Sequence, residues 1–244
     1  MIAIYSDLHL DIDDSKAGNQ EFFKTLRALP SKGVLEVWLL GDIYDLLVGP
    51  FGFWKKTHQQ FFSTLAFLSD HKVKVLWVEG NHDFHLKKLM TDLGVEYHQE
   101  DLTYEIESKK VYLGHGDTVN QLDQEYLKWR RVIKSPIFRR AISLAPNFVA
   151  KNIMLPIARK ASRQSRSREK SRNLDLADQA YQDFVHSLIK DSGYDAVFLG
   201  HHHKKQLQKI QKGFYLNLGC WSSNTGRYAL WTPSKTPEII ELSF

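Results

Sequence analysis

The sequence predicts an α/β fold in which a sheet of mostly parallel strands is covered by helices. Up to Val95, short apolar runs alternate with stretches of helical spacing in the order β-α-β-α-β-α. This alternation is typical of parallel sheets. Several apolar runs also end in a cluster of Asp, Asn or His side chains, as expected at the carboxyl edge of such a sheet.

The N-terminal part is expected to hold three strands and three helices. The strands are short, apolar and rich in β-branched residues, and are predicted at residues 2–6, 34–40 and 73–79. The helices carry apolar side chains three or four positions apart, and are predicted at residues 19–29, 58–69 and 86–93. Pro30 ends the first helix, and Gly94 has the position of a residue that terminates the third. Residues 11–19 and 48–54 are expected to be loops.

The hydrophobic pattern changes after Val95. Residues 102–106 and 111–113 are expected to form a hairpin. The segment from Leu122 to about Arg172 is mostly helical in spacing and is interrupted by three prolines, and a further helix is expected over residues 174–190. The remaining strands are predicted at residues 196–199, 206–210, 214–218, 227–231 and 238–242, with the last four spaced as hairpins.

Composition indicates one globular domain over residues 1–244. The hydrophobic content of 43% and the charged content of 25% are ordinary for a soluble protein. No window approaches the roughly 18 uninterrupted apolar residues of a membrane span. The single cysteine, Cys220, excludes an internal disulfide and favours a reducing compartment. Without a recognisable signal peptide at the N-terminus, the protein is expected to be cytoplasmic.

The positive charge is concentrated in one segment. From Lys128 to Arg172 there are 14 basic residues and one acidic residue, whereas the rest of the chain has 19 basic and 27 acidic residues. An anionic partner for this segment is therefore expected.

The polar residues at the strand ends predict a metal site. They comprise two carboxylates, one amide and four imidazoles: Asp7, His9, Asp42, Asn81, His115, His201 and His203. Oxygen donors mixed with imidazole suit Mn, Fe or Zn in a catalytic site. Seven ligands exceed what one ion takes, so two divalent ions sharing a bridging carboxylate are expected, about 3.5–4 Å apart.

Five ordered motifs resemble those of the calcineurin-like metallophosphoesterases. They are Asp7-Leu8-His9, Gly41-Asp42-Ile43-Tyr44-Asp45, Gly80-Asn81-His82-Asp83, Gly114-His115 and Gly200-His201-His202-His203. The resemblance implies a four-layer α-β-β-α sandwich with two metal ions at its edge. One ion would take Asp7, His9, Asp42 and His203, and the other Asp42, Asn81, His115 and His201. It also implies that His82 protonates the leaving oxygen or holds the phosphate, and that Asp45 orients His82.

The segment after His115 is similar to the UDP-2,3-diacylglucosamine hydrolases of lipid A synthesis. That resemblance implies cleavage of an acylated nucleotide-sugar pyrophosphate with Mn, under a helical lid at about residues 121–172. The implied substrate contacts are Asn81, His82, Asp123, Tyr126, Arg159 and Ser162. Because the insertion is both apolar and basic, we expect it to receive acyl chains and to contact the cytoplasmic face of the inner membrane. No obligate protein partner is evident.

Departures from the lipid enzymes leave other substrates open. Those enzymes usually have Arg at the position of His82, Thr at that of His202 and Cys at that of Asn120. A related lipid or nucleotide diphosphate is one alternative. A nuclease is another, but the insertion has few of the aromatic residues on which single-stranded nucleic acids stack.

Other interpretations of the insertion and of the whole protein also exist. In one, the apolar positions of the insertion serve only to pack it on the core. A Ser/Thr protein phosphatase would have Arg-Gly after Asp45, where this chain has Leu46-Leu47. A non-enzymatic scaffold would have lost metal ligands, whereas all seven are present here.

Overall fold

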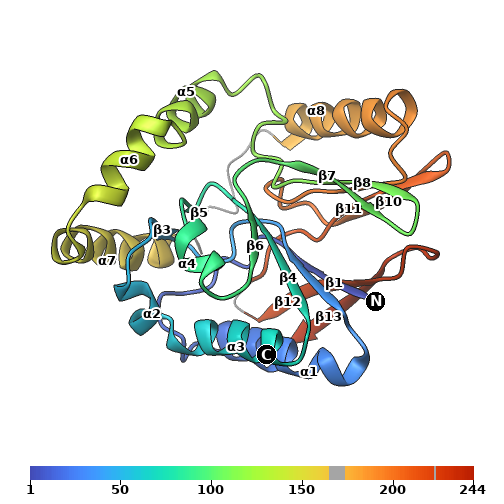
Figure 1. The fold of residues 1–244 in the computed structure, drawn as a ribbon. Helices are drawn as coiled ribbons and strands as arrows, with labels where there is room; N and C mark the ends of the chain where they lie inside the picture. Colours follow the sequence, from blue (N-terminus) through green and yellow to red (C-terminus); the bar gives the residue numbers. More distant parts are fainter. Residues whose placement is uncertain (165–173, 223) are drawn as a thin grey trace.

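Two β-sheets pack face to face in the computed structural model, and helices cover the outer face of each sheet (Figure 1). The structure describes residues 1–164, 174–222 and 224–244; within these ranges, the side chains of residues 161–164 and 174–176 are outside the description. The four layers confirm the predicted α-β-β-α sandwich.

The first sheet has six strands in the order β13-β12-β1-β2-β4-β6. Its parallel half consists of β1 (Ile2–Tyr5), β2 (Glu36–Leu39), β4 (Lys74–Val78) and β6 (Glu96–His98). The chain returns at its end to add β12 (Thr225–Trp231) antiparallel to β1, followed by β13 (Glu238–Ser243). The three strands predicted in the N-terminal part therefore lie side by side, and β6 is a strand that the sequence pattern did not predict.

The second sheet has five strands in the order β10-β11-β9-β8-β7. The hairpin of β7 (Leu102–Ile106) and β8 (Lys109–Leu113) lies at one side, and that of β10 (Gln206–Ile210) and β11 (Gly213–Asn217) at the other. Between them, β9 (Ala196–Phe198) runs parallel to both β8 and β11. Two short strands, β3 (Leu47–Val48) and β5 (Asp83–Phe84), form a separate parallel pair.

Helices form both outer layers. Below the first sheet in Figure 1 lie α1 (Ala17–Ala28) and α3 (Gln59–Asp70), and above the second sheet lies α8 (Leu174–His186), which continues into a π-helical turn at Ser187–Asp191. Shorter helices are η1 (Pro30–Lys32), α2 (Phe53–Thr57) and α4 (Lys87–Thr91). The sequence pattern missed β3 and α2, which lie in or beside the segment predicted to be a loop.

Three further helices project from one end of the sandwich (Figure 1). They are α5 (Gln124–Ile133), α6 (Pro136–Leu144) and α7 (Asn147–Gln164), which we call the lid helices. Asp123 caps α5 and Ser135 caps α6, each by accepting a hydrogen bond from a backbone N–H of the first turn. Two of the three prolines lie at helix boundaries, but Pro156 lies within α7. These helices fall in the segment predicted as a lid; that they act as one stays a prediction.

The alternation of side chains along each strand builds two of the hydrophobic layers. In β1, Ile2 and Ile4 face the second sheet, whereas Ala3 and Tyr5 face α1 and its neighbours. All four are buried, because a strand in the middle of a sandwich is covered on both faces. This packing fixes the position of β1 in the sandwich and therefore the place where the polar residues that follow it lie.

No single helix in the described ranges is long and apolar enough to cross a membrane. Taken together, α6 and Asn147–Lys160 have the length and composition of a membrane span, but the two helices are bent by 114° relative to each other.

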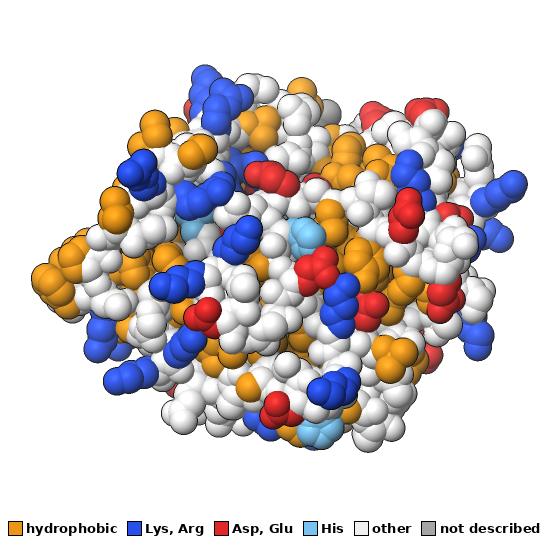
Figure 2. Space-filling view, viewed as in Figure 1, with side chains coloured by type: hydrophobic (Ala, Val, Ile, Leu, Met, Phe, Trp, Pro, Cys, Tyr) orange, Lys and Arg blue, Asp and Glu red, His pale blue; other side chains and the backbone are white. Residues whose placement is uncertain are grey.

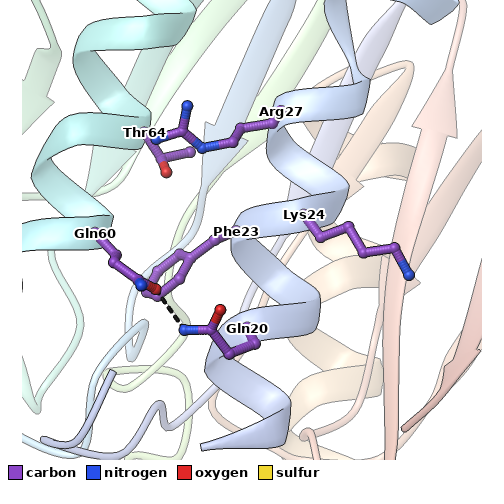
Figure 3. A pocket seen from close by; sticks show the side chains of 6 residues that line it. All are labelled: Gln20, Phe23, Lys24, Arg27, Gln60 and Thr64. Atoms are coloured by element: carbon purple, nitrogen blue, oxygen red, sulfur yellow. Dashed lines mark hydrogen bonds between the residues drawn. The ribbon is translucent and has the colours of Figure 1, made fainter. Parts of the chain in front are cut away.

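A small cavity of about 240 Å³ lies between α1 and α3 (Figure 3). Polar side chains surround its mouth, and the Gln20 amide donates a hydrogen bond to Gln60 across it. The cavity is lined by none of the residues that the sequence singled out, so the candidate site must lie elsewhere.

Phe198 tests the packing between the sheets. It is fully buried, and its ring centroid lies 5.7 Å from that of Trp38 and 5.1 Å from that of Trp231. Phe198→Ala should lower the free energy of unfolding by about 3–5 kcal/mol, because it leaves a cavity between aromatic rings. Urea denaturation measures the loss. Leu35→Ala, at a position 65% exposed, is the control, and an equal loss in both variants would contradict this account of the core.

Candidate metal centre

All seven predicted metal ligands meet at one edge of the sandwich. They follow the carboxyl ends of five strands, three from the first sheet and two from the second: β1, β2, β4, β8 and β9. Backbone hydrogen bonds hold the loops together. The N–H of Asp7 donates to the carbonyl of Gly41 at 3.1 Å, and that of His9 donates to the carbonyl of Asp42 at 3.0 Å. The loop after β1 is thereby fixed against the loop after β2.

The side chains form two neighbouring groups around Asp42. In the first, His203 Nε2 lies 3.1 Å from His9 Nε2 and 3.5 Å from Asp7 Oδ1. In the second, Asn81 Oδ1 lies 3.0 Å from His115 Nε2 and 2.8 Å from His201 Nδ1. Asp42 Oδ2 lies 3.8 Å from His9 Nε2 and 3.3 Å from His115 Nε2. Asp42 therefore has the position of a carboxylate shared by two groups.

Hydrogen bonds outside the two groups orient the ligand atoms. His115 Nδ1 donates to the carbonyl of Leu40 at 2.9 Å, which turns Nε2 toward Asp42. The backbone N–H of His82 donates to Asp42 Oδ1 at 2.8 Å, and that of His201 donates to Asp7 Oδ1 at 2.7 Å. Asp42 Oδ1 is thus held by backbone while its Oδ2 faces the imidazoles, whereas Asp7 Oδ1 takes both the backbone N–H and the contact with His203.

The buried carboxylates create a negative field. Burial alone would raise the pKa of Asp42, but the imidazoles around it, His115 foremost, hold that pKa well below its usual value. Burial likewise opposes protonation of His115, yet the charges of Asp42 and Asp7 raise its pKa to about 10. The centre therefore favours positive charge strongly, and divalent cations would supply it.

The residues present fit a pair of divalent cations. Asp7 is fully buried, and its Oδ2 has no hydrogen-bond partner among the described residues. A buried carboxylate oxygen without a partner is costly unless a cation binds it. Three groups could hold a metal ion: Asp7-His9-His203, Asp42-His115-His201 and His9-Asp42-His82. The first two fall within the two predicted ligand sets, whereas the third includes His82, which was predicted to be catalytic and not a ligand.

Backbone strain is concentrated at the same residues. Asp7, His9, Asp42, His201 and His203 account for five of the ten non-glycine residues with positive φ in the described part of the chain, with φ between 46° and 64°. Such conformations are unfavourable for residues with a side chain and persist where the surrounding structure imposes them. In this centre, the ends of the strands and the hydrogen bonds between neighbouring loops impose these conformations.

The family model described as "Calcineurin-like phosphoesterase" matches residues 1–205, which includes all five loops of the centre. The chain belongs to this family. A phosphoesterase of this kind is a metal-dependent hydrolase, and the family implies divalent metal ions at the ligand groups described above.

Curated relatives of the chain share one name. It is 26% identical over 223 residues to a UDP-2,3-diacylglucosamine hydrolase of Pseudomonas fluorescens (strain Pf0-1), with 87% of this chain and 83% of the relative covered. It is 25% identical over 224 residues to the hydrolase of the same name from Escherichia coli O139:H28, with 88% and 89% covered. A solved archaeal phosphodiesterase has the same fold, with a TM-score of 0.54, 16% identity and 99% of both chains covered.

The remaining predicted residues of this phosphoesterase lie in different settings. His82 Nδ1 donates to the backbone carbonyl of Asp45 at 2.8 Å, whereas the Asp45 carboxylate lies 3.5 Å from His9 Nδ1. The predicted orientation of His82 by a carboxylate is therefore not seen; a carbonyl does it. The catalytic roles of His82 and Asp45 stay predictions.

The predicted substrate contacts on the lid helices are only partly gathered at the centre. The Tyr126 ring lies 5.7 Å from that of His201, between centroids, and the Asp123 carboxylate accepts the Tyr126 N–H as the cap of α5. Arg159 is exposed on α7. The side chain of Ser162 lies outside the described residues.

Several residues that support the centre were missed as functional positions. The Asp83 carboxylate accepts N–H groups of Gly80, Asp42 and Ile43 at 2.8, 3.0 and 2.6 Å, and so joins the loops after β2 and β4. Burial, together with the charge of Asp42, raises the pKa of Asp83 to about 7. Asp83 is the last residue of the motif that contains Asn81, so its position was visible in the sequence although its role was not.

Helix α5, the first of the lid helices, is attached to the loops of the centre by charged residues. Buried Asp117 accepts hydrogen bonds from the Tyr126 hydroxyl at 2.7 Å and from Arg130 Nε at 2.5 Å. Buried Lys134 donates to Glu79 Oε2 at 2.8 Å and to the carbonyl of Gly80 at 2.9 Å. Asp117 belongs to the loop after β8, two residues after the predicted ligand His115, so its position could have been noticed in the sequence. Nothing in the sequence distinguishes Lys134 from the other basic residues of the insertion.

Gly80 provides a test of the centre without changing a ligand. A Cβ at Gly80 would lie 2.2 Å from Asp42 Oδ1 and 2.3 Å from the Asp42 nitrogen, so the two loops would have to separate. Gly80→Ala should therefore weaken binding of a divalent ion at least about tenfold, as loss of a supporting contact does in other metal sites. Calorimetric titration of Mn²⁺ into the metal-free protein measures this.

Gly52→Ala is the matched control for that substitution. A Cβ there meets nothing within 4 Å, and its φ of −62° suits alanine. Unchanged Mn²⁺ affinity in Gly80→Ala would show that the loops do not need their close approach.

Proposed function

We propose that this phosphoesterase uses two divalent metal ions, most simply Mn²⁺, to hydrolyse the pyrophosphate of UDP-2,3-diacylglucosamine or a close analogue, releasing UMP and lipid X. The single observation that carries the proposal is an exposed apolar surface on helices rooted at the metal centre. Lipid A synthesis would then be its pathway, as the resemblance of the segment after His115 implies; the curated relatives are named for the same substrate.

The lid helices carry most of the exposed large apolar side chains in the described part of the chain. They are Trp129, Val132, Ile137, Leu144, Phe148, Ile153 and Ile157, between 48% and 84% exposed. Other side chains of the same helices, including Ile133 and Ile142, are buried against the core. The alternative that the apolar positions only pack the insertion on the core accounts for that second set and leaves the first unexplained, because an apolar surface of this extent favours a lipid or protein ligand.

Basic residues surround these apolar side chains. Figure 2 shows Lys and Arg side chains gathered on the side of the molecule that carries the lid helices and α4, next to exposed apolar side chains at its end. An apolar surface bordered by cations suits a ligand with acyl chains and an anionic headgroup. It also supports contact with the cytoplasmic face of the inner membrane, from which such a substrate would be drawn.

The residues of the centre have distinct tasks in the proposed reaction. When bound, the two ions would neutralise phosphate oxygens and lower the pKa of a water molecule. Asp42 would be shared between the ion sites, Asp7, His9 and His203 would complete one, and Asn81, His115 and His201 the other.

His82 would act on the phosphate itself. A ring nitrogen of His82 lies within 4.8 Å of ligand atoms of His9 and Asp42. Because Nδ1 donates to the carbonyl of Asp45, Nε2 carries a proton only in the imidazolium form, and in that form it would protonate the leaving oxygen or donate a hydrogen bond to a phosphate oxygen. Tyr126, beside His201, and Asn81 would contact the substrate from the other side, with Asp123, Arg159 and Ser162 contributing from the lid.

An assay with two substrates tests the proposal. Purified protein with Mn²⁺ should release UMP from UDP-2,3-diacylglucosamine and should also cleave bis-p-nitrophenyl phosphate. His9→Ala, which lacks a candidate ligand, should do neither while remaining folded by circular dichroism. Cleavage of the generic diester alone would refute the lipid substrate and retain the metal centre. Preferential cleavage of single-stranded DNA, lost steeply with added salt, would favour a nuclease.

The acyl-chain role of the lid is separated from the chemistry by Phe148→Glu. Phe148 is 70% exposed, so the change should leave the fold intact. It should lower kcat/KM for the lipid substrate about tenfold or more, since full burial of a Phe side chain stabilises by about 1.5–3 kcal/mol, and leave the generic diester unaffected. Asn152→Glu, which adds the same charge at an exposed position of α7, is the control.

A further inference from the structure

A second and larger cavity opens beside the lid, away from the candidate ligands. It has a volume of about 740 Å³ and lies between α4, α6 and the start of α7. Its lining includes Phe51, His85, Lys88 and Arg139, and none of the predicted metal ligands. Its size falls in the range of pockets that bind small molecules.

Two buried nitrogens at this cavity have no partner. His85 is 4% exposed, and its Nε2 donates to the carbonyl of Ile133 at 2.7 Å. Its other ring nitrogen, Nδ1, is buried and has no hydrogen-bond partner among the described residues. The same holds for Arg139 Nε, although the Arg139 side chain is partly accessible. Buried polar atoms without partners are rare and costly, so a bound group that paired with them would be stabilised.

The charge of the lining favours an anion. Lys87, Lys88 and Arg139 contribute three positive charges, and the acidic side chain among the lining residues is Asp92. Asp92 is partly neutralised, since its carboxylate lies 3.7 Å from Lys55 Nζ. The first residue of α7, Asn147, also lines the cavity, and the first turn of an α-helix has N–H groups without intrahelical partners and a positive dipole end. Anions bind readily at such helix ends.

His85 adds a requirement that a bare anion does not meet. Because a carbonyl can only accept, Nε2 carries the proton and the neutral ring presents Nδ1 as an acceptor. Burial, aided by the charges of Lys134 and Arg139, lowers the pKa of His85 and keeps the ring neutral. The ligand should therefore donate a hydrogen bond to His85 and accept one from Arg139.

We propose that this cavity binds a phosphate ester of a polyol, such as a glycerol or sugar phosphate, at a site separate from the metal centre. The phosphate would accept from Arg139, Lys87, Lys88 and the first turn of α7. A hydroxyl of the polyol would donate to His85 Nδ1.

The surroundings of the cavity allow two sources for this chemistry. Leu144 and Phe148 follow directly in sequence on the lining residues Ser143 and Asn147, and are 75% and 70% exposed. A soluble polyol phosphate would use the cavity alone. The headgroup of a glycerophospholipid would place its acyl chains beside these two side chains.

Calorimetry with glycerol 3-phosphate tests the soluble source, using the Mn²⁺-loaded protein. Phosphate esters also bind divalent metal centres, so the readout is the difference between two matched variants, Arg139→Gln and Arg140→Gln. Arg140 is exposed on the same helix and does not line the cavity. Arg139→Gln should weaken one binding event at least about tenfold, as expected for loss of a hydrogen bond to a charged group, and Arg140→Gln should change it less than twofold.

A second variant and a fold control keep the test decisive. His85→Gln retains a donor for the carbonyl of Ile133 but removes the acceptor at Nδ1, so it should weaken the same event. Arg139→Gln should still hydrolyse bis-p-nitrophenyl phosphate at the wild-type rate, which checks that it folds and loads metal.

Vesicles distinguish the lipid source. Binding to phosphatidylglycerol vesicles that exceeds binding to phosphatidylcholine, and that Arg139→Gln reduces at least tenfold more than Arg140→Gln does, would identify a lipid headgroup as the ligand. Dependence on Arg139 in either the soluble or the vesicle experiment supports the site. If Arg139→Gln and Arg140→Gln behave alike in both, the proposal is wrong.

Discussion

The burial of three carboxylates at one edge of the sandwich is the constraint on which the rest of the structure depends. Asp7, Asp42 and Asp83 are each no more than 1% exposed. Each accepts a hydrogen bond from a backbone N–H group of a neighbouring loop. These bonds tie the loops of two sheets to one another, and they leave a concentration of negative charge that only cations or protons can offset. The geometry of the fold and the need for metal therefore have the same origin.

The lid is built onto that centre through its first helix. The buried pair of Lys134 and Glu79 lies directly before the loop that carries Asn81, and Arg130 is bound to Asp117 just after His115. The start of the lid is thus attached at both sides of the metal centre by charge-assisted hydrogen bonds, which are stronger than neutral ones. The apolar side chains of α6 and α7 therefore follow a helix that is fixed to the candidate metal centre, as the proposed lipid substrate would require.

Much of this arrangement follows from the sequence. The central strands are short and apolar, and strands of that kind in an α/β pattern must place their ends together, so the sequence indicated that the seven candidate ligands would lie near one another. The four-layer sandwich itself came from the resemblance of the motifs, since the spacing alone suggested an open sheet. What could not be predicted depends on distant residues. Strand β6 has no strong pattern, because each of its three residues is only partly buried.

The supporting residues show the same limit. The Asp45 carboxylate was expected to orient His82, but the backbone carbonyl of Asp45 makes the contact instead. Lys134 is one basic residue among many until the fold buries it against Glu79. The orphaned nitrogens of His85 and Arg139 could not be foreseen either, because being unpaired is a property of the assembled neighbourhood and not of a residue type.

The left-handed backbone at five of the metal ligands has a consequence for the life of the protein in the cell. Each such residue has an unfavourable backbone conformation that the native contacts must overcome. A metal ion that binds the native centre and not the unfolded chain shifts the folding equilibrium by mass action. Metal supply would then set how long the protein survives proteolysis as well as how fast it turns over.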